Sequence, residues 1–464
     1  MAQINEEFRN RMLAILPNEA DRLCQALFST EPEVSVRLNC RKTRTQPNNA
    51  QQVAWCDCGY YLDGRPAFTF DPLLHTGAYY VQDASSMFIH RVLSQLVGDR
   101  DVTYLDLCAA PGGKTTTALG ALSDGSLVVC NEIDGTRAQI LRENVIKWGC
   151  PNCVVTNDNA TRLGKLRNVF DVVAADMPCS GEGMFRKDEE AVSQWSPELV
   201  KQCAERQREI AADIWNALKP GGIFIYSTCT FNREENEEMA DYIVRELGAE
   251  SVEIATDPSW HIQPGIDTPH HCYRFMPHHT RGEGLFMCVL RKDGEMPASK
   301  PDKGKKQKKE KRAAIPAVCK NWLTATDCDW LADGETISAL PSRHSETMQL
   351  VAHNARTLLC GVPVASVKGK DTIPDHALSQ SLLFNTEAFP CVDVSYPEAI
   401  AFLRGETFAL PDGLPRGYVC IRYAQRPLGF MKNIGNRANN CYPKEWRIRS
   451  SFAPAEIPTV IPAD

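Results

Sequence analysis

Five short apolar runs, separated by polar or helical segments, constrain the fold of this chain more than any other feature. They lie between residues 101 and 295 and read VTYLDL, SLVVCNEI, CVVTND, FDVVAADM and GGIFIYST. Continuous apolar runs are typical of strands buried on both faces of a parallel sheet, with helices as crossovers. The pattern predicts an α/β fold with a Rossmann-like, doubly wound sheet that binds its ligand beyond the carboxyl ends of the strands.

A chain of 464 residues exceeds what one hydrophobic core usually holds, so further domains are expected. Helical periodicity and the strand-like VSVRLNC predict an α/β cap over residues 1–100. A lysine-rich stretch predicts a solvated linker over 296–314, either a simple tether or a contact for nucleic-acid phosphates. We expect a mixed connecting domain over 315–387, and short strands such as GYVCIRYA predict a β-rich domain over 388–464.

The charge of the chain argues against wholesale electrostatic binding of nucleic acid. The formal net charge is -7 and the pI is about 5.9, so any such contact must be local. The N-terminal MAQINEEFRN does not resemble a secretory leader, and no apolar stretch is long enough to cross a bilayer. We therefore expect a cytoplasmic monomer without membrane contact.

The 19 cysteines are scattered and odd in number, which favours reduced thiols over a disulfide framework. Cys56-x-Cys58 and Cys150-x2-Cys153 each resemble half of a metal site. Neither is followed by a second pair at zinc spacing, so core or surface cysteine is the favoured interpretation and no metal is predicted.

The stretch LDLCAAPGGKTT ends in the Gly-Lys-Thr of a phosphate loop. A phosphate loop reads G-x-x-x-x-G-K-[ST], and its first glycine position falls here on Cys108, which makes nucleoside triphosphate binding a minor alternative. What remains is a strand ending at Asp106, a loop of small residues and a helix beginning near Lys114. Gly112 and Gly113 allow close approach of a ligand, and an amino-acid moiety suits this site.

Further carboxylates end the next two strands. Glu132 is suited to accept both ribose hydroxyls of an adenosine, and Asp158 to accept the adenine amino group. Each alone is more often a helix cap or a turn residue. Together with Asp106 they form a series at successive strand ends, which favours a ligand that contains adenosine.

Two cysteines follow the fourth and fifth strands. Cys179 lies in MPCSGEG and Cys229 in STCT, so both should lie at the edge that carries the small-residue loop. A single cysteine at a strand end is usually inert packing. Two of them beside Asp176 indicate thiolate chemistry, but the residues alone do not rank one cysteine above the other.

The segments CAAPGGKTT, DMPCSGEGMFRKD and YSTCTFNREENE resemble the RNA cytosine-C5 methyltransferases of the Sun/NSUN group, and GEGMFRK is similar to the RsmF-type 16S rRNA enzymes. The resemblance implies that S-adenosylmethionine is the methyl donor. It assigns the donor loop to Cys108, Ala109, Ala110, Pro111, Gly112, Gly113 and Lys114. It also implies that Glu132 holds the ribose, that Asp158 faces the adenine, and that Asp176 lies beside donor and target base.

The resemblance also implies the catalytic roles. Cys229 would add to cytosine C6, which makes C5 nucleophilic, and Cys179 would assist release of the product. Asp176, kept protonated or sharing a proton, would hydrogen-bond N3 of the base and stabilise charge that develops on the ring. Lys114 is either a helix-start residue or a cation that lowers a thiol pKa. The general base that removes the C5 proton stays open.

Contacts with RNA are expected because a paired base must leave its stack to reach such a site. Arg186 and Lys187 follow the first cysteine loop, and His278 and Arg281 lie in RFMPHHTRGEGLF, which resembles another family motif. Surface positions without RNA contact explain these residues equally well.

Segments at both ends of the chain also match the family. The resemblance makes the cap an RNA-binding segment, in which Arg37 would touch RNA and Gln82 would line the cleft, although strand pairing explains both. The C-terminal region resembles a PUA-like RNA-binding domain, and the alternative is an ordinary small β-barrel. The implied substrate is 16S rRNA or the small ribosomal subunit, near the decoding region. A tRNA methyltransferase and a catalytically silent rRNA-binding assembly factor are the rivals.

Overall fold

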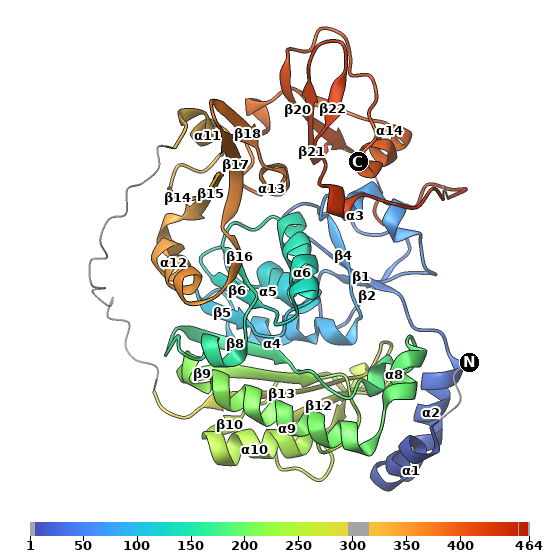
Figure 1. Cartoon of the computed structure of the whole chain (residues 1–464). Helices are drawn as coiled ribbons and strands as arrows, with labels where there is room; N and C mark the ends of the chain where they lie inside the picture. The colour runs from blue at the N-terminus through green and yellow to red at the C-terminus, as the bar shows by residue number, and fades with distance from the viewer. Residues whose placement is uncertain (1–4, 296–314, 453, 463–464) are drawn as a thin grey trace.

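The computed structural model describes residues 5–295, 315–452 and 454–462 (Figure 1). The predicted basic linker, 296–314, lies outside the described residues. In the described part of the chain, every helix is too short or too polar to cross a membrane.

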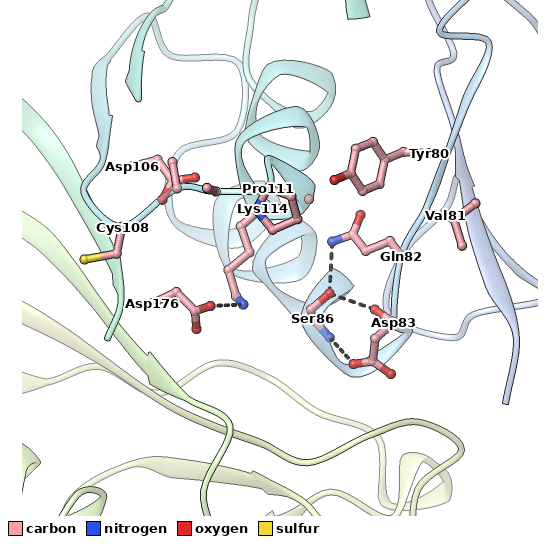
Figure 2. Close-up of a pocket in the computed structure, with 13 residues that line it drawn as sticks. Tyr80, Val81, Gln82, Asp83, Ser86, Asp106, Cys108, Pro111, Lys114 and Asp176 are labelled. Carbon is pink, nitrogen blue, oxygen red and sulfur yellow. Dashed lines mark hydrogen bonds and ion pairs between the residues drawn. The ribbon is translucent and has the colours of Figure 1, made fainter. Parts of the chain in front are cut away.

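The central sheet has five parallel strands in the order β7-β6-β5-β8-β9, as the five apolar runs predict. The chain leaves β5 in one direction, through β6 and β7, and returns to β8 on its other side. This reversal creates a ligand site at the carboxyl ends of β5 and β8. Asp106 and Asp176 end those two strands (Figure 2). The strands are β5 (Thr103–Asp106), β6 (Leu127–Asn131), β7 (Cys153–Thr156), β8 (Phe170–Asp176) and β9 (Leu218–Thr228).

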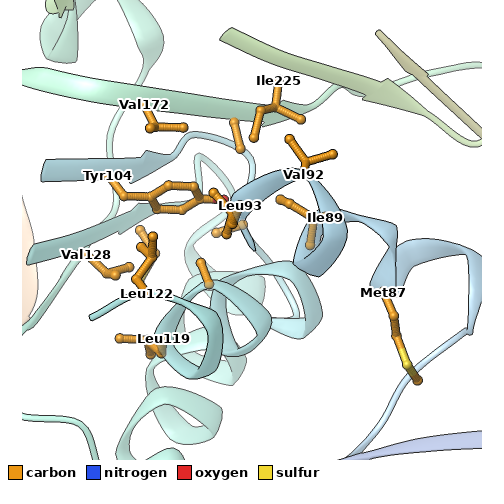
Figure 3. Close-up of a cluster of buried hydrophobic side chains, with 14 of the residues drawn as sticks. Met87, Ile89, Val92, Leu93, Tyr104, Leu119, Leu122, Val128, Val172 and Ile225 are labelled. Carbon is orange, nitrogen blue, oxygen red and sulfur yellow. The ribbon is translucent and has the colours of Figure 1, made fainter. Parts of the chain in front are cut away.

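Helices cover both faces of the sheet, because successive strand residues point to opposite sides. Tyr104 belongs to the apolar core under α4, α5 and α6 (Figure 3), whereas its neighbour Leu105 belongs to the core under α9, α10 and α12. Both faces are thus buried, which explains the unbroken apolar runs. The helices are α4 (Phe88–Leu96), α5 (Gly113–Ala121), α6 (Gly135–Trp148), α7 (Ala160–Leu163), α8 (Glu189–Gln194), α9 (Pro197–Ile214), α10 (Glu237–Leu247) and α12 (Ser345–Asn354).

Antiparallel strands extend the sheet at both ends. On one side β13 pairs with β9, followed by β12 and β11, and β10 also pairs with β13. On the other side β16 pairs with β7, although it comes from the segment after the linker. The alternation of strand and helix predicts only the parallel part. The added strands are β10 (Ala249–Ser251), β11 (Gln263–Pro264), β12 (Cys272–Phe275), β13 (Leu285–Lys292) and β16 (Thr357–Cys360).

The N-terminal region packs in two places. Helices α1 and α2 lie against α8 (Figure 1), where Phe8 contacts Phe185 and Trp195 edge to face. A four-stranded antiparallel sheet, β2-β3-β1-β4, lies beside α5 and α6 instead. These elements are α1 (Glu6–Ile15), α2 (Ala20–Ser29), β1 (Ser35–Leu38), β2 (Gln51–Gln52), β3 (Gly59–Tyr61), α3 (Pro72–His75) and β4 (Tyr79–Val81).

The cap sheet docks on the carboxyl end of α6. Lys42 donates to the carbonyl oxygens of Thr76 and Lys147, and the Asn39 amide donates to those of Gly77 and Trp148. These contacts satisfy carbonyl groups that a helix end leaves without partners. Gly77 has φ +67, and a Cβ there would lie 1.9 Å from the Lys147 oxygen, so only glycine allows this approach.

Two small sheets form the C-terminal third of the chain. The order is β14-β15-β17-β18 in the first and β19-β20-β21-β22 in the second. The second sheet packs on the cap: Phe70 joins its apolar core, and Tyr396 donates to the Phe70 oxygen. The elements are α11 (Ala317–Asn321), β14 (Cys328–Asp333), β15 (Thr336–Pro341), β17 (Val362–Lys368), β18 (Asp371–Pro374), α13 (His376–Gln380), β19 (Cys391–Asp393), α14 (Tyr396–Arg404), β20 (Gly417–Tyr423), β21 (Arg426–Asn433) and β22 (Ala438–Asn440).

Replacing Gly77 by alanine should destabilise the protein more than replacing Gly64. Both glycines lie in the cap with positive φ, but a Cβ at Gly64 meets nothing within 4 Å. Gly64→Ala carries only the left-handed backbone cost of about 1–2 kcal/mol. Gly77→Ala must also push the cap away from α6. Urea unfolding of the two variants measures the difference, and equal losses would contradict this account of the docking.

Candidate active site

A cavity of about 210 Å³ opens at the carboxyl end of β5, between the loop after that strand and the cap (Figure 2). Of the seven predicted donor-loop residues, Gly112 does not line this cavity. It has φ +115 and precedes the first residue of α5, so it sets the turn from loop to helix. The sheet side of the cavity is lined by Asp106, Cys108, Ala109, Ala110, Pro111, Gly113, Lys114 and Asp176.

The opposite wall comes from the cap, between β4 and α4. Tyr80, Gln82, Asp83 and Ser86 face the donor loop across the cavity. The Gln82 amide donates to Ser86 and to Thr117 of α5, both at 3.1 Å. Gln82 therefore lines the cleft, as expected. The sequence did not predict Tyr80, Asp83 or Ser86 as site residues. The polar side chains that follow a strand in VQDASSM were a usable signal for Asp83 and Ser86.

Arg37 is fully buried and does not lie at an RNA-accessible surface, so the prediction that it touches RNA is wrong. Its Nε donates to Gln82 at 2.8 Å, its Nη2 donates to Thr116 at 2.6 Å, and its guanidinium lies over the ring of Trp148. Arg37 instead joins the cap to α5.

Asp106 is a buried carboxyl group at the floor of the cavity. Thr115 donates to its Oδ2 at 2.6 Å. Burial raises the pKa of Asp106 to about 7, against the opposing effect of the Thr115 hydrogen bond and the charge of Lys114. The group is thus sensitive to a cation placed in the cavity, which would favour its ionised form.

Lys114 and Asp176 form an ion pair at the mouth of the cavity (Figure 2). Lys114 Nζ lies 2.9 Å from one Asp176 oxygen, and Ser227 donates to the other at 2.8 Å. Burial acts to lower the pKa of Lys114, but Asp176, Asp106 and Cys229 together outweigh burial, so this pKa lies above its ordinary value. Lys114 therefore stays a cation.

Cys179 and Cys229 face each other, with 3.2 Å between their sulfur atoms. A hydrogen bond to Cys229, together with burial and the charge of Glu235, raises the pKa of Cys179 well above its ordinary value. The raised pKa favours the protonated thiol at Cys179, which lies within hydrogen-bonding distance of the Cys229 sulfur. The cation of Lys114 lies within electrostatic range of Cys229.

Two buried carboxylates hold the cysteine loops together. Glu182, in the loop after β8, accepts from the backbone N–H groups of Phe231 and Asn232 in the loop after β9. Glu235, in the loop after β9, accepts from the N–H of Ser180 at 3.0 Å. Burial raises the pKa of Glu235 to about 7. Glu182 and Glu235 lie in the two cysteine-containing segments that carry the family resemblance, but the sequence alone predicted no role for either glutamate.

Glu132 and Asp158 lie at the ends of β6 and β7, outside the cavity lining. Glu132 is buried, accepts from the N–H of Asp134 and lies 3.6 Å from Arg137. The two oxygens of Asp158 accept from the N–H groups of Asn159 and Arg356. Arg356 immediately precedes β16, so the added strand holds Asp158 in place.

The predicted RNA-contacting side chains differ in accessibility. Arg186 is only 4% exposed and donates to the carbonyl oxygens of Ala26 and Gly282, whereas Lys187 is 39% exposed and pairs with Glu283 at 2.8 Å. His278 is 3% exposed and contacts Glu19. The contacts of Arg186 and His278 are thus within the protein, and Lys187 is the more accessible of the three.

Three family models match the chain. The 16S rRNA methyltransferase RsmB/F model covers residues 94–291, the N-terminal domain of RsmF covers 4–84, and the RsmF PUA domain covers 389–448. Two solved structures from Pyrococcus horikoshii share the fold. A methyltransferase homolog has a TM-score of 0.53 at 23% identity and covers 62% of this chain and 95% of its own. NSun6, solved with SFG, has a TM-score of 0.54 at 19% identity; the match covers 63% of this chain and 99% of the NSun6 chain.

Curated relatives match over most of their length. Ribosomal RNA small subunit methyltransferase F of Aliivibrio fischeri is 30% identical over 413 residues, 85% of each chain. The protein of the same name from Vibrio atlanticus is 28% identical and covers 95% of this chain and 97% of its own. With its cysteine pair, cap and C-terminal sheet in one chain, the protein belongs to the RsmF-type family of 16S rRNA methyltransferases, within the Sun group.

Proposed function

We propose that the protein transfers a methyl group from S-adenosylmethionine to C5 of a cytosine in 16S rRNA, through a covalent bond between Cys229 and C6. The observation that carries this proposal is the pair of facing cysteines beside Lys114 and Asp176, at the edge of the sheet where the cavity opens. Family membership supports the substrate class, and we propose a target near the decoding region, as the sequence resemblance implies.

The residues around the cavity suit the donor. Small side chains of the loop leave room beside the backbone, and carboxyl groups from Asp106 and Asp176 suit the ammonium group of an amino-acid moiety. We assign the donor loop, from Cys108 to Lys114, to that moiety, Glu132 to the ribose and Asp158 to the adenine. S-adenosylmethionine supplies an electrophilic methyl group when bound there.

Cys229 is the proposed nucleophile. Its sulfur forms a bond to C6, and the electron pair of the C5–C6 bond moves to C5 and the ring. An S–H donor and a cation beside it are the surroundings that stabilise an attacking sulfur. After the C5 proton is removed, the bond to C6 breaks, and the Cys179 proton is placed to stabilise the departing sulfur at 3.2 Å.

Asp176 and Lys114 are proposed to stabilise the charge that develops on the cytosine ring during the reaction. Asp176 is positioned by Lys114 and Ser227, so its carboxyl group points to the mouth of the cavity without free rotation. Because N3 of the base is an acceptor, this hydrogen bond requires a proton that Asp176 holds or shares with the ring. A carboxyl group already fixed beside N3 costs no reorganisation during the reaction. The lysine is thus assigned a role in positioning Asp176 and supplying positive charge.

The remaining domains are proposed to hold the RNA. The PUA domain and the exposed part of the Lys187 side chain support an RNA substrate. Several aromatic residues of the C-terminal region, such as Phe430 and Tyr442, are buried in its core, so its exposed cations Arg416, Arg437 and Arg449 are better candidates for contacts. We further propose that the protein acts as a monomer, and an rRNA substrate supports a cytoplasmic location.

Incubation with labelled S-adenosylmethionine should produce 5-methylcytidine in unmodified small ribosomal subunits or in naked 16S rRNA. Digestion to nucleosides identifies the product, and tRNA serves as the competing substrate. Label only in tRNA would overturn the substrate assignment but keep the chemistry. Label in none of the three would favour the silent assembly factor.

Cys229→Ala should lower methylation by about 10³-fold or more, because the attacking group is lost. Cys179→Ala should instead accumulate a protein–RNA adduct that survives denaturing electrophoresis, because release is impaired. Cys328→Ala, a half-buried cysteine of β14, serves as the control and should behave as the parent. An adduct that accumulates only with Cys229→Ala would reverse the two roles.

Lys114→Met should reduce the rate of methyl transfer by about 10²–10³-fold, the usual effect of removing a preorganised charge. The apolar stem is kept, so the thermal midpoint should change little. Lys201→Met removes an exposed lysine of α9 and is the matched control. Single-turnover kinetics separate the chemical step from binding. An unchanged single-turnover rate would show that Lys114 only begins α5.

A further inference from the structure

Four side chains outside the active site converge where the cap meets α4. The ligand atoms of Cys56, Cys58 and His90 all lie within 4.8 Å of one another. Cys40 lies two residues after Leu38, whose N–H donates to the Cys58 oxygen, so its thiol belongs to the same corner of the cap. We propose that Cys40, Cys56, Cys58 and His90 bind one zinc ion.

The spacing of the sulfur atoms fits zinc. Zinc binds cysteine sulfur at about 2.3 Å in tetrahedral geometry, which places two such sulfurs about 3.8 Å apart. The sulfurs of Cys56 and Cys58 lie 3.8 Å apart. A disulfide would bring them to about 2.05 Å. Three thiols and one imidazole form a closed four-ligand set, which is typical of a structural zinc site.

The backbone holds this arrangement independently of any ion. Cys56 and Cys58 occupy a tight turn in which Gly59 N–H donates to the Cys56 oxygen, and the Cys58 oxygen accepts from Leu38 of β1. Cys40 lies just after β1, and His90 lies in α4. A Cβ on Gly59 would lie 2.6 Å from the Met87 sulfur, so glycine permits α4 to approach the turn.

A nearby buried cation balances the charge of the site. Zinc binding displaces three thiol protons, and three thiolates with one Zn²⁺ and a neutral imidazole carry a net charge of -1. Arg37 pairs with Gly59 in the cap sheet, is fully buried, and forms no ion pair with a carboxylate among the described residues. Its positive charge acts on the thiols of Cys58, Cys56 and Cys40. The cluster therefore offers Arg37 a negative partner.

The sequence predicts no metal, because neither Cys56-x-Cys58 nor Cys150-x2-Cys153 is followed by a second pair at zinc spacing. The fold supplies the other half of the site from Cys40 and His90, which lie on either side of the pair in sequence. The ion would tie two cap loops to α4, close behind the wall formed by Tyr80 and Ser86. This inference does not depend on the proposed reaction.

The test is the metal content of the full-length protein, purified without chelator. We expect one zinc per chain by elemental analysis, and its removal by a chelator should lower Tm by several degrees, because binding energy is folding energy. After removal, Co²⁺ should bind in its place and give the intense visible absorption of a tetrahedral site with thiolate ligands. Zinc below the buffer blank, together with no such Co²⁺ spectrum, would overturn the proposal.

Variants locate the ion. Cys56→Ala with Cys58→Ala should abolish zinc binding. Cys40→Ser replaces an exposed ligand that a folded protein should tolerate, and it should weaken Co²⁺ binding and alter the spectrum. The control is Cys130→Ala with Cys153→Ala, a buried pair whose sulfurs lie 3.9 Å apart but which forms no metal-binding group with other described side chains. Zinc lost only in this control would refute the assignment, as would an alkylation-resistant Cys56–Cys58 disulfide found by mass spectrometry.

Discussion

The hydrogen bonds of one buried guanidinium hold the two halves of the donor cavity together. Arg37 belongs to the cap sheet, yet it donates to Thr116 of α5 and to Gln82 of the cap wall, and it lies over Trp148 of α6. The cavity exists only because the cap wall stands opposite the donor loop. Burial of a charge without a nearby carboxylate is costly, so this arrangement requires every polar contact that surrounds it.

The parallel sheet and the active-site edge could be predicted from the sequence, because both follow from local pattern. Apolar runs identify strands, and parallel strands carry their carboxyl ends to one edge, so Asp106, Asp176, Cys179 and Cys229 had to meet there. The ranking of the two cysteines did not follow from pattern. The proposed ranking rests on the family resemblance. The tertiary structure adds that the charge of Glu235 acts on the Cys179 thiol and that Lys114 lies within electrostatic range of Cys229.

The burial and contacts of several charged side chains could not be predicted from the sequence, because they arise from contacts between distant segments. Arg37 looked like a surface cation in a strand, and nothing in VSVRLNC shows that its side chain is enclosed by α5 and α6. Arg186 similarly follows a polar loop but turns inward to the Ala26 carbonyl. In the sequence, Glu182 and Glu235 resemble ordinary acidic residues. In the structure, each accepts a hydrogen bond from a backbone N–H of the other cysteine-containing loop.

The strand β16 has a consequence for how the protein is made. It pairs with β7, and the residue before it holds Asp158, yet it is separated from the rest of the sheet by the linker and the first strands of the C-terminal third. During synthesis, β7 therefore emerges long before its partner and presents an open edge. The sheet edge that holds Asp158 is complete only after residue 360 has left the ribosome. The order of synthesis thus delays completion of the central sheet until shortly before the PUA domain is made.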